Sequence, residues 1–539
     1  MCRVCTKPHR PQPAGTHEPL GDAAVAVSLG GARPPRVDAK DLPPGVTDLV
    51  VAFGRAVAYF DPAIVEVAAG ASPSEAVGKW LAAAPGASGS PARGARGAIE
   101  VPVFYGGAEG ADLEEVARRA GLTAEEVVAR HARPYRVAAV GFQPGFPYLE
   151  GLPEELQVPR RDTPRPRVPA GSVAIGGPYT GVYPNESPGG WRLIGRTATR
   201  LYDPRREPAA LVQPGDTVRF RAIDRAEFDR LTVEPRPARR AAAADGEAVL
   251  RVVSAGAWTA LHAPAPRGRR SAGAPAGGPM DAEAHRLACA LAGGPVGGAA
   301  IEATLVGPVL EALRDVRLGL AGATPARLRG SRRIDLAAGQ RLDLRALAGG
   351  ARAYVAAAGG LVGLEGERLS DGDPIHSAPT EPADLQPTPE WWGPSATRRA
   401  TLRLLAGPQS ELLGPSGLDR LCRSAWRVGS QSNRMGLRLD GPPVSLAGAP
   451  PDESQPTCHG AVQLPGDGRP IVLGADAQTL GGYPIVAVVA SVDWPALAQL
   501  RPGDPVRFEP ITLAEAEHFR RLAERELALA IQGFRLRLK

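Results

Sequence analysis

The chain has 539 residues, of which 43% are hydrophobic and 22% are charged, with a formal net charge of +6. This length exceeds the ~100–200 residues of one domain, so we expect three or four compact units. The chain has no block of five like charges and no apolar run of the ~18–20 residues that span a membrane, which argues against a nucleic-acid-binding or membrane protein. The 65 glycines and 56 prolines indicate many turns and short strands.

Two apolar stretches, residues 23–29 and 49–54, predict strands, and helices follow them. Ser72 precedes a proline at a helix start, and Thr123 begins a Thr-x-x-Glu capping box. His131 ends a predicted helix, where the partial negative charge favours a protonated imidazole, although a structural role is the other interpretation.

From about residue 133 to 222 the pattern changes to short strands between Gly/Pro turns, typical of a compact β-barrel or sandwich. Residues 224–247 include a Pro, Arg and Ala run without hydrophobic periodicity, which predicts a tether between two halves. A second boundary is predicted near residues 376–396. Thr512 starts a closing amphipathic helix that we expect to reach about Ile531.

The two halves carry a weak internal repeat. Residues 214–220 (PGDTVRF) match residues 502–508 (PGDPVRF), and upstream of them residues 180–184 (TGVYP) match residues 480–484 (LGGYP). Two matched landmarks in the same order indicate one small β-fold used twice, although PGD is also a common turn. We therefore predict a mainly β protein with α+β parts.

The numbers of lysines and cysteines argue against several kinds of functional site. Lysine occurs at only four positions, which argues against Schiff-base or phosphate-loop lysine chemistry. Any bound anion would therefore be held by arginine side chains and backbone amides.

The five cysteines are odd in number, and Cys2 and Cys5 form a single CxxC pair that closes no zinc site. We expect no metal ligands in the chain. Residues 1–17 lack the apolar core of a signal peptide and predict a disordered tail of a cytoplasmic protein.

Residues 141–197 are the densest unusual segment and a candidate pocket for an anionic small molecule. Glycines and prolines fix turns that bring backbone amides together, and arginines supply planar donors beside aromatic side chains. The predicted contacts of this segment are Arg160, Arg165, Ser172, Tyr183, Trp191 and Arg196. The alternative is a tightly turned barrel whose arginines are solvated and whose Ser172 hydroxyl satisfies its own backbone.

Motifs in both halves resemble one family pair. GF-x-PGFPYL, VPAGSVAI, TGVYP, SPGGW and LIGRT, within about residues 18–225, resemble the family of 5-oxoprolinase B subunits, which includes the KipI kinase inhibitors. SNRMGLRLDG, GAVQLPGDGRPIVLGADAQTLGGYP and LAQLRPGDPVRF are similar to the family of 5-oxoprolinase C subunits, also labelled biotin-dependent carboxyltransferase-like. GGPMD, AIEATLVGP and RAYVAAAGG are similar to that family too.

The resemblance implies cyclophilin-like β-barrel units. It divides the chain into a small α/β domain (18–96), a first barrel (97–223), a linker (224–247), a truncated barrel (248–390) and a second cyclophilin-like barrel with the C-terminal helix (391–539).

The resemblance also implies a function. Family members open 5-oxo-L-proline to L-glutamate at the expense of ATP, together with a separate A subunit of the LamB/YcsF type, and the chain would be inactive without that partner. ATP together with Mg²⁺ is the implied cofactor, and no biotin is attached to this chain. A lactam is a stable amide, and phosphorylating its carbonyl oxygen would create the leaving group that lets water add.

The C-like half supplies the predicted catalytic groups Asp281, Glu302 and Asp476. Asp281 and Glu302 are candidates for an acid and base pair, unless Asp281 only caps the following helix. The predicted substrate or phosphate contacts in this half are Ser432, Arg434, Gln463, Gln478, Thr479 and Tyr483.

Two departures from the family pattern fall in the first barrel of the C-like half. Residues 262–268 (HAPAPRG) replace the usual QD-x-GR-x-G stretch, and the Gly-Ser-Arg-Ser-Thr segment is missing after Gly360. Two alternatives therefore stay open: a KipI-like regulator that binds a histidine kinase, and a carboxyltransferase-like protein of the urea amidolyase type. The sequence does not decide whether the chain forms a homo-oligomer.

Overall fold

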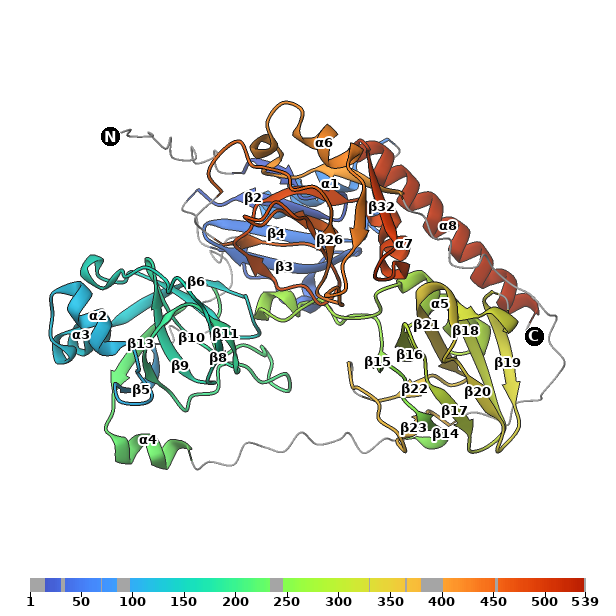
Figure 1. The fold of residues 1–539 in the computed structure, drawn as a ribbon, viewed down its shortest axis with the longest axis horizontal. Coiled ribbons are helices and arrows are strands. Elements are labelled where there is room, and N and C mark those ends of the chain that lie inside the picture. Colours follow the sequence, from blue (N-terminus) through green and yellow to red (C-terminus); the bar gives the residue numbers. More distant parts are fainter. Residues whose placement is uncertain are drawn as a thin grey trace.

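The computed structural model describes residues 15–30, 34–68, 70–84, 97–232, 246–328, 330–363, 366–379, 401–450 and 454–537. Most of the predicted N-terminal tail, residues 233–245 of the predicted tether and residues 380–400 lie outside the described residues. Figure 1 shows three bodies, of which the central one contains both the N-terminal strands and the last barrel.

The N-terminal strands form an antiparallel sheet in the order β1 (His17–Pro19), β2 (Ala24–Ser28), β4 (Arg55–Phe60) and β3 (Val46–Ala52). Helix α1 (Pro73–Ala83) packs on this sheet and begins as predicted, because the Ser72 hydroxyl accepts the backbone N–H of Glu75. The short helix η1 (Ala39–Asp41) lies between β2 and β3. Both strands that the sequence predicted here are confirmed.

The first barrel is a closed ring of seven strands, β6-β7-β10-β9-β12-β5-β13. Their bounds are β5 (Ile99–Tyr105), β6 (Pro134–Val140), β7 (Pro147–Glu150), β9 (Ser172–Gly176), β10 (Tyr179–Val182), β12 (Arg192–Arg196) and β13 (Thr217–Ala222). Outside the ring are the pair β8 (Arg165–Val168) and β11 (Ser187–Gly189), and the helices α2 (Leu113–Ala120), α3 (Ala124–His131), η2 (Glu154–Leu156) and α4 (Arg225–Thr232). Helix α4 occupies the first part of the predicted tether.

The C-like half begins with two five-stranded sheets that share one hydrophobic core. One sheet contains β20 (Arg341–Asp343), β17 (Val309–Ala312), β14 (Glu247–Ser254), β23 (Pro374–Ser377) and β22 (Leu361–Val362). The other contains β15 (Trp258–His262), β16 (Ala300–Thr304), β21 (Leu347–Ala357), β18 (Val316–Pro325) and β19 (Arg332–Leu336), with α5 (Ala282–Ala292), η3 (Arg270–Ala272) and η4 (Ala326–Leu328) nearby in the chain. Where the resemblance implied a truncated barrel, the unit has two five-stranded sheets, which isolated bridges join at Ala260–Arg368 and Ala299–Leu361.

The second barrel is again a ring of seven strands, β24-β31-β28-β29-β26-β25-β32. Their bounds are β24 (Thr401–Ala406), β25 (Trp426–Val428), β26 (Gly436–Asp440), β28 (Ala461–Gln463), β29 (Ile471–Leu473), β31 (Ile485–Val489) and β32 (Pro505–Pro510). Around it lie the pair β27 (Gln455–Pro456) and β30 (Leu480–Gly481), the short helices η5 (Ser410–Leu413), α6 (Gly417–Arg423), η6 (Ser491–Asp493) and α7 (Trp494–Gln499), and the long α8 (Leu513–Arg537). Helix α8 starts after Thr512 as predicted and continues past Ile531. Among the described residues no helix is both long and apolar enough to cross a membrane.

Strand pairing confirms the internal repeat at its first landmark. The PGD turns lead into β13 and β32, and each of these strands pairs in parallel with the first strand of its ring and antiparallel with the second. The second landmark is wrong: residues 180–182 belong to the ring strand β10, whereas Leu480 lies in β30, outside the ring. The counterpart of β30 is β11, so SPGGW rather than TGVYP matches LGGYP.

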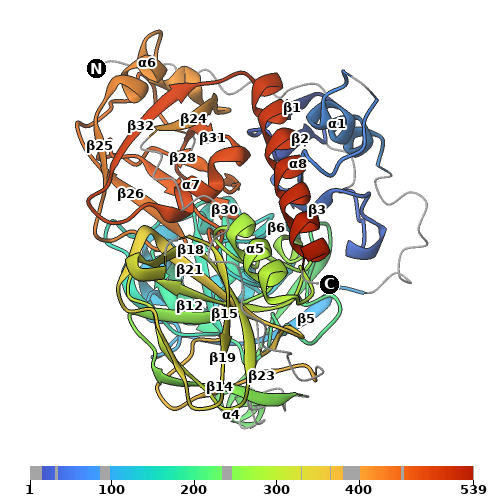
Figure 2. The same ribbon diagram turned by 90° about the vertical axis from the view of Figure 1, so that its right-hand side faces the viewer.

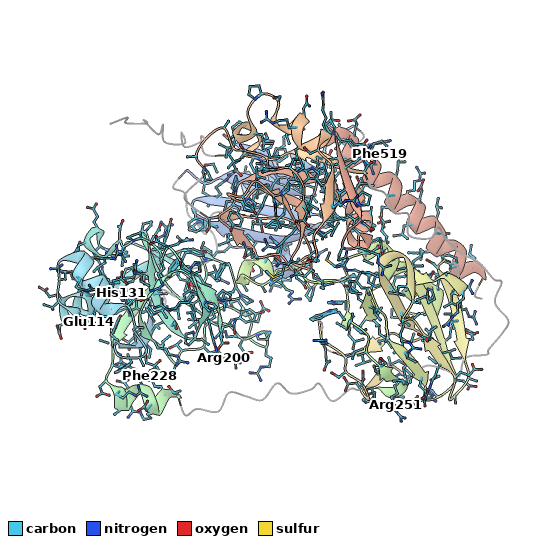
Figure 3. All side chains as sticks on the ribbon, in the orientation of Figure 1. Glu114, His131, Arg200, Phe228, Arg251 and Phe519 are labelled. Carbon is cyan, nitrogen blue, oxygen red and sulfur yellow. The ribbon has the colours of Figure 1, made fainter. Side chains whose placement is uncertain are left out.

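His131, labelled in Figure 3, is the last residue of α3 and is buried against strands of the first barrel. Its ring is hydrogen-bonded to the Tyr105 hydroxyl (2.8 Å) and the Thr180 hydroxyl (2.7 Å) and stacks on Phe220. Burial lowers the pKa of His131 to about 3. The expected protonated imidazole is therefore wrong, because desolvation outweighs the charge of the helix end, and the histidine is structural.

Candidate functional site

Two of the three predicted arginines of the B-like half are engaged with carboxylates. Arg165 donates to both carboxylate oxygens of Asp112 at 2.9 and 2.7 Å, and Arg196 donates to Glu109 at 3.0 Å and to the Ala170 carbonyl at 2.9 Å. Burial acts to raise the pKa of Asp112, but the hydrogen bonds from Arg165 and the Leu193 N–H more than offset it, and the pKa is lowered. These two arginines join β8 and the ring strand β12 to the segment before α2.

The aromatic side chains of residues 141–197 pack together in the hydrophobic core. Tyr183 and Trp191 are buried, and both rings meet Phe146 edge to face, with centroids 5.2 and 5.3 Å away. Arg160 is exposed and lies over Trp191 at 5.8 Å. The Ser172 hydroxyl donates to the Pro169 carbonyl at 2.8 Å, which is the backbone-satisfying arrangement. The predicted contacts of the B-like half thus stay predictions, with most of their polar groups already bonded within the protein.

A buried carboxylate lies where the two-sheet unit of the C-like half meets the second barrel. Glu302 on β16 is fully buried and accepts hydrogen bonds from Arg434 (2.7 Å), the Tyr354 hydroxyl (2.8 Å) and the Met280 N–H (2.9 Å). Tyr354 is its cross-strand partner on β21, which explains how the hydroxyl reaches it. Arg352 Nε is a further 3.5 Å neighbour.

Arg434 links this carboxylate to a second one at the surface. Its Nε and Nη2 atoms donate to the two oxygens of Asp476 at 2.7 and 2.9 Å, and Nη2 also donates to the Gly278 carbonyl at 2.6 Å. Both residues come from loops of the second barrel, after β25 and after β29. The Asp476 side chain is 34% exposed, so the guanidinium connects buried Glu302 to an accessible carboxylate.

Asp281 caps α5, which is one of the two roles that the sequence left open, and it also lies next to Glu302 through Tyr354. One oxygen caps α5 by accepting the Ala284 N–H at 2.9 Å, and the other accepts Nε2 of Gln499 at 2.7 Å. Its own backbone N–H donates to the Tyr354 hydroxyl at 2.8 Å, so Tyr354 bridges Asp281 and Glu302. We call Asp281, Glu302, Tyr354, Arg434 and Asp476 the Glu302 network.

The two buried carboxyl groups of this network differ in acidity. Burial raises the pKa of Asp281 to about 6. Burial also acts on Glu302, but Arg434 and Arg352 reverse its effect and lower the pKa of Glu302 to about 2. A pair with separated pKa values can hold one exchangeable proton beside one permanent negative charge.

A second polar group surrounds the glycine turn after β30. Gln463 and Thr479 are buried, and neither Gln463 Nε2 nor Thr479 Oγ1 has a hydrogen-bond partner in the part of the chain that the structure describes. A Cβ on Gly481 would lie 2.8 Å from Gln463 Nε2 and 3.0 Å from Gln478 Nε2, so glycine is required for both amides to approach. Ser432 and Tyr483 belong to neither group: Ser432 bonds to the Arg438 backbone, and the Tyr483 ring is exposed.

Comparison with known proteins follows this division into halves. A family model described as carboxyltransferase domain, subdomain C and D, matches residues 35–212, and one described as subdomain A and B matches residues 272–510. The C subunit of 5-oxoprolinase from Escherichia coli (strain K12) is 34% identical over 294 residues, which cover 50% of this chain and 93% of that protein. The chain belongs to the family of 5-oxoprolinase C subunits. The resemblance of the sequence motifs is confirmed.

Further relatives match each half or both. The B subunit of 5-oxoprolinase from Escherichia coli O157:H7 is 58% identical over 123 residues, or 23% of this chain and 56% of that protein. The chain thus spans about half the length of the curated B-type relatives it matches. The crystal structure of TTHA0988 superimposes with a TM-score of 0.75 and 33% identity, covering 87% of this chain and 94% of that one.

Sequence reasoning about this 5-oxoprolinase family member missed three side chains of the site. Tyr354 lies two residues after Arg352 in the RAYVAAAGG strand, so the two-residue period of a strand could have placed both side chains on one face. Gln499 lies in the LAQLRPGD motif and accepts the Arg352 N–H at 3.0 Å. His459 stacks on Trp494 at 4.3 Å, and burial, with Arg270 and Arg434 nearby, lowers its pKa to about 3. Nothing in the sequence marks His459.

Proposed function

We propose that the chain is the fused B and C component of an ATP-dependent 5-oxoprolinase, which opens 5-oxo-L-proline to L-glutamate in the cytoplasm together with a separate A subunit. The observation that carries this proposal is the order of the halves, in which relatives named as the B and C subunits of 5-oxoprolinase match successive parts of one chain. The Glu302 network supports it, because it lies where the two units of the C-like half meet.

The polar groups suit a small lactam that bears a carboxylate. Arg434 is the planar donor nearest the surface on this network, and its accessible edge is held by Asp476. A substrate carboxylate can take the place of Asp476 on that edge. A lactam N–H and carbonyl can form hydrogen bonds with the amide groups of Gln463 and Gln478 and with the Thr479 hydroxyl.

Ring opening makes the lactam nitrogen a leaving group that must gain a proton. Asp281 can hold a proton near neutral pH because of its raised pKa, while Glu302 stays ionised and keeps Arg434 in place. We assign Asp281 the role of proton reservoir and Glu302 the role of a positioning residue.

ATP activates the lactam carbonyl when it is bound to the complex. Arg165 and Arg196 do not fit a phosphate as arranged, because Asp112 and Glu109 already occupy their donor edges. We therefore place nucleotide and Mg²⁺ binding outside this pair of arginines.

The test is a reconstituted assay. Purified chain is mixed with an A subunit of the LamB/YcsF type, ATP and 5-oxoproline, and glutamate and phosphate are measured. We expect turnover only when both proteins are present, and a loss of at least about tenfold in Arg434→Lys, of the order seen when a positioned polar contact is removed. Arg438→Lys, at an exposed arginine of the same barrel, is the matched control. Absence of turnover with an A subunit that is active with its own B and C partners contradicts the proposal.

A carboxyltransferase is the second candidate. The family models carry that name, and a putative urea carboxylase of Emericella nidulans is 30% identical over 324 residues, although these cover only 26% of that protein. This activity needs a biotin carrier from another protein. Transfer of a carboxyl group from carboxybiotin to urea, without 5-oxoproline turnover, would favour it. A KipI-like regulator would instead change the autophosphorylation of a histidine kinase.

A further inference from the structure

Helix α8 has an apolar face on each side. Leu527, Ile531 and Phe534 are buried and pack with Ala290 and Leu291 of α5. A second set of apolar side chains points away from the protein, with exposed fractions of 38, 42, 61 and 68% for Phe519, Leu522, Leu529 and Leu536. Figure 2 shows α8 on the surface of the molecule beside α5.

The outer apolar side chains follow a heptad. Leu522, Leu529 and Leu536 are seven residues apart, and seven residues of an α-helix fall ~20° short of two full turns. They therefore form one nearly straight stripe, opposite the face that packs on α5. Phe519, labelled in Figure 3, borders the stripe, and the Arg403 guanidinium covers its ring at 4.9 Å from the centroid.

Ion pairs on the inner face prevent the helix from turning this stripe inward. Arg286 donates to both carboxylate oxygens of Glu524 at 2.7 and 2.8 Å. Arg520, mostly buried, binds Asp61 at 3.0 Å and Glu283 at 3.1 Å. Within the part of the chain that the structure describes, no segment covers these leucines.

We propose that this stripe docks on the same stripe of a second copy of the chain, with the two α8 helices parallel. In that arrangement each leucine lies against its own copy, as leucines do at one position of parallel two-stranded coiled coils. Charge favours this partner. Exposed Arg525 and Glu526 flank the stripe on opposite sides, so a parallel twofold axis places Arg525 beside Glu526 of the second copy, and the reverse. An antiparallel pairing of the three leucines would instead separate these charges by about seven residues along the helix, or roughly 10 Å, and lose both pairs.

The oligomeric state and its geometry test this proposal in the full-length chain. We expect sedimentation equilibrium to give a dimer that Leu529→Glu converts to a monomer, with no change when exposed Ile64 is replaced by glutamate. Arg525→Glu alone and Glu526→Arg alone should each weaken the dimer, and the double variant should restore it, because the reversed charges again face each other.

A cysteine crosslink fixes the direction of the helices. Leu522→Cys should form an intermolecular disulfide on mild oxidation, because residue 522 meets its own copy in the parallel arrangement, whereas an antiparallel pairing of the three leucines places it against residue 536. Ile64→Cys, at a similarly exposed position, should not. A wild-type chain that sediments as a monomer at all concentrations overturns the proposal, as does a dimer that persists in Leu529→Glu or fails to crosslink through Cys at position 522.

Discussion

The carboxylate of Asp48 accepts the backbone N–H of Arg270 at 2.7 Å, although the two residues are 222 positions apart. Asp48 lies on β3 of the N-terminal sheet and also accepts the N–H groups of Leu49 and Ser271. The Arg270 side chain then donates to the Thr457 carbonyl at 2.6 Å and covers the Tyr59 ring at 4.2 Å. This chain of contacts joins the B-like half to both units of the C-like half.

Replacing Asp48 by alanine should weaken this junction. The substitution leaves buried N–H groups without an acceptor, and we expect a loss of about 2 kcal/mol in the stability of the junction. Hydrogen exchange of the amides of residues 270 and 271 is the measurement. Asp41→Ala, at an exposed position before the same strand, is the control and should change nothing. Unchanged protection in Asp48→Ala would show that the contact contributes no stability.

The two halves should remain together after the chain is cut between them. They share one hydrophobic cluster, and the Tyr59 hydroxyl donates to the Thr457 carbonyl while Asp22 accepts the N–H and hydroxyl of Ser491. We expect that a protease site inserted in residues 233–245, once cleaved, leaves fragments that co-elute in gel filtration. Two separate peaks at micromolar concentration would mean that the interface depends on the covalent link.

Local chemistry is where the sequence was informative. The caps at Ser72 and Thr123 and the PGD turns before β13 and β32 were predictable because their hydrogen bonds span only a few residues. The carboxyl groups of the candidate site were also found, because Asp281, Glu302 and Asp476 fall in family motifs.

Long-range pairing is where the sequence failed. Nothing near Arg165 indicates that Asp112, 53 residues away, occupies its guanidinium, and Arg434 meets Glu302 across 132 residues. The order of strands in the two rings was also needed to test the internal repeat. TGVYP and LGGYP are similar in sequence, but they lie on strands with different partners and are not equivalent. These facts depend on the packing of whole units, which no local pattern encodes.

His131 should make the first barrel less stable in mild acid. Its pKa in the folded chain is about 3, below the ordinary value of 6.5, so the unfolded chain binds the extra proton and stability is lost as pH falls below about 6.5. From pH 7 to pH 5 this residue alone should cost about 2 kcal/mol. Hydrogen exchange of β6 and β13 amides at the two pH values measures it. His131→Gln should lose this part of the pH dependence, whereas His518→Gln, on the exposed face of α8, should keep it.

Glu302→Gln should destabilise the junction of the two-sheet unit and the second barrel by roughly 3 kcal/mol at pH 7, because it leaves the buried Arg434 with one carboxylate fewer. The folded pKa of Glu302, about 2, lies below the ordinary 4.5, so its contribution is present above pH 4.5 and is lost as pH falls towards 2. The difference in unfolding free energy between wild type and variant should therefore shrink below pH 4.5.

Asp281 changes stability in the opposite direction. Its pKa is raised to about 6, so the stability that its protonated form contributes is lost as pH rises from about 4 to 6. Hydrogen exchange of β16 and β21 across this range separates the two, with exposed Glu247→Gln as control. A wild-type-to-variant difference that stays constant from pH 7 to pH 3 would mean that Glu302 is not held ionised by Arg434.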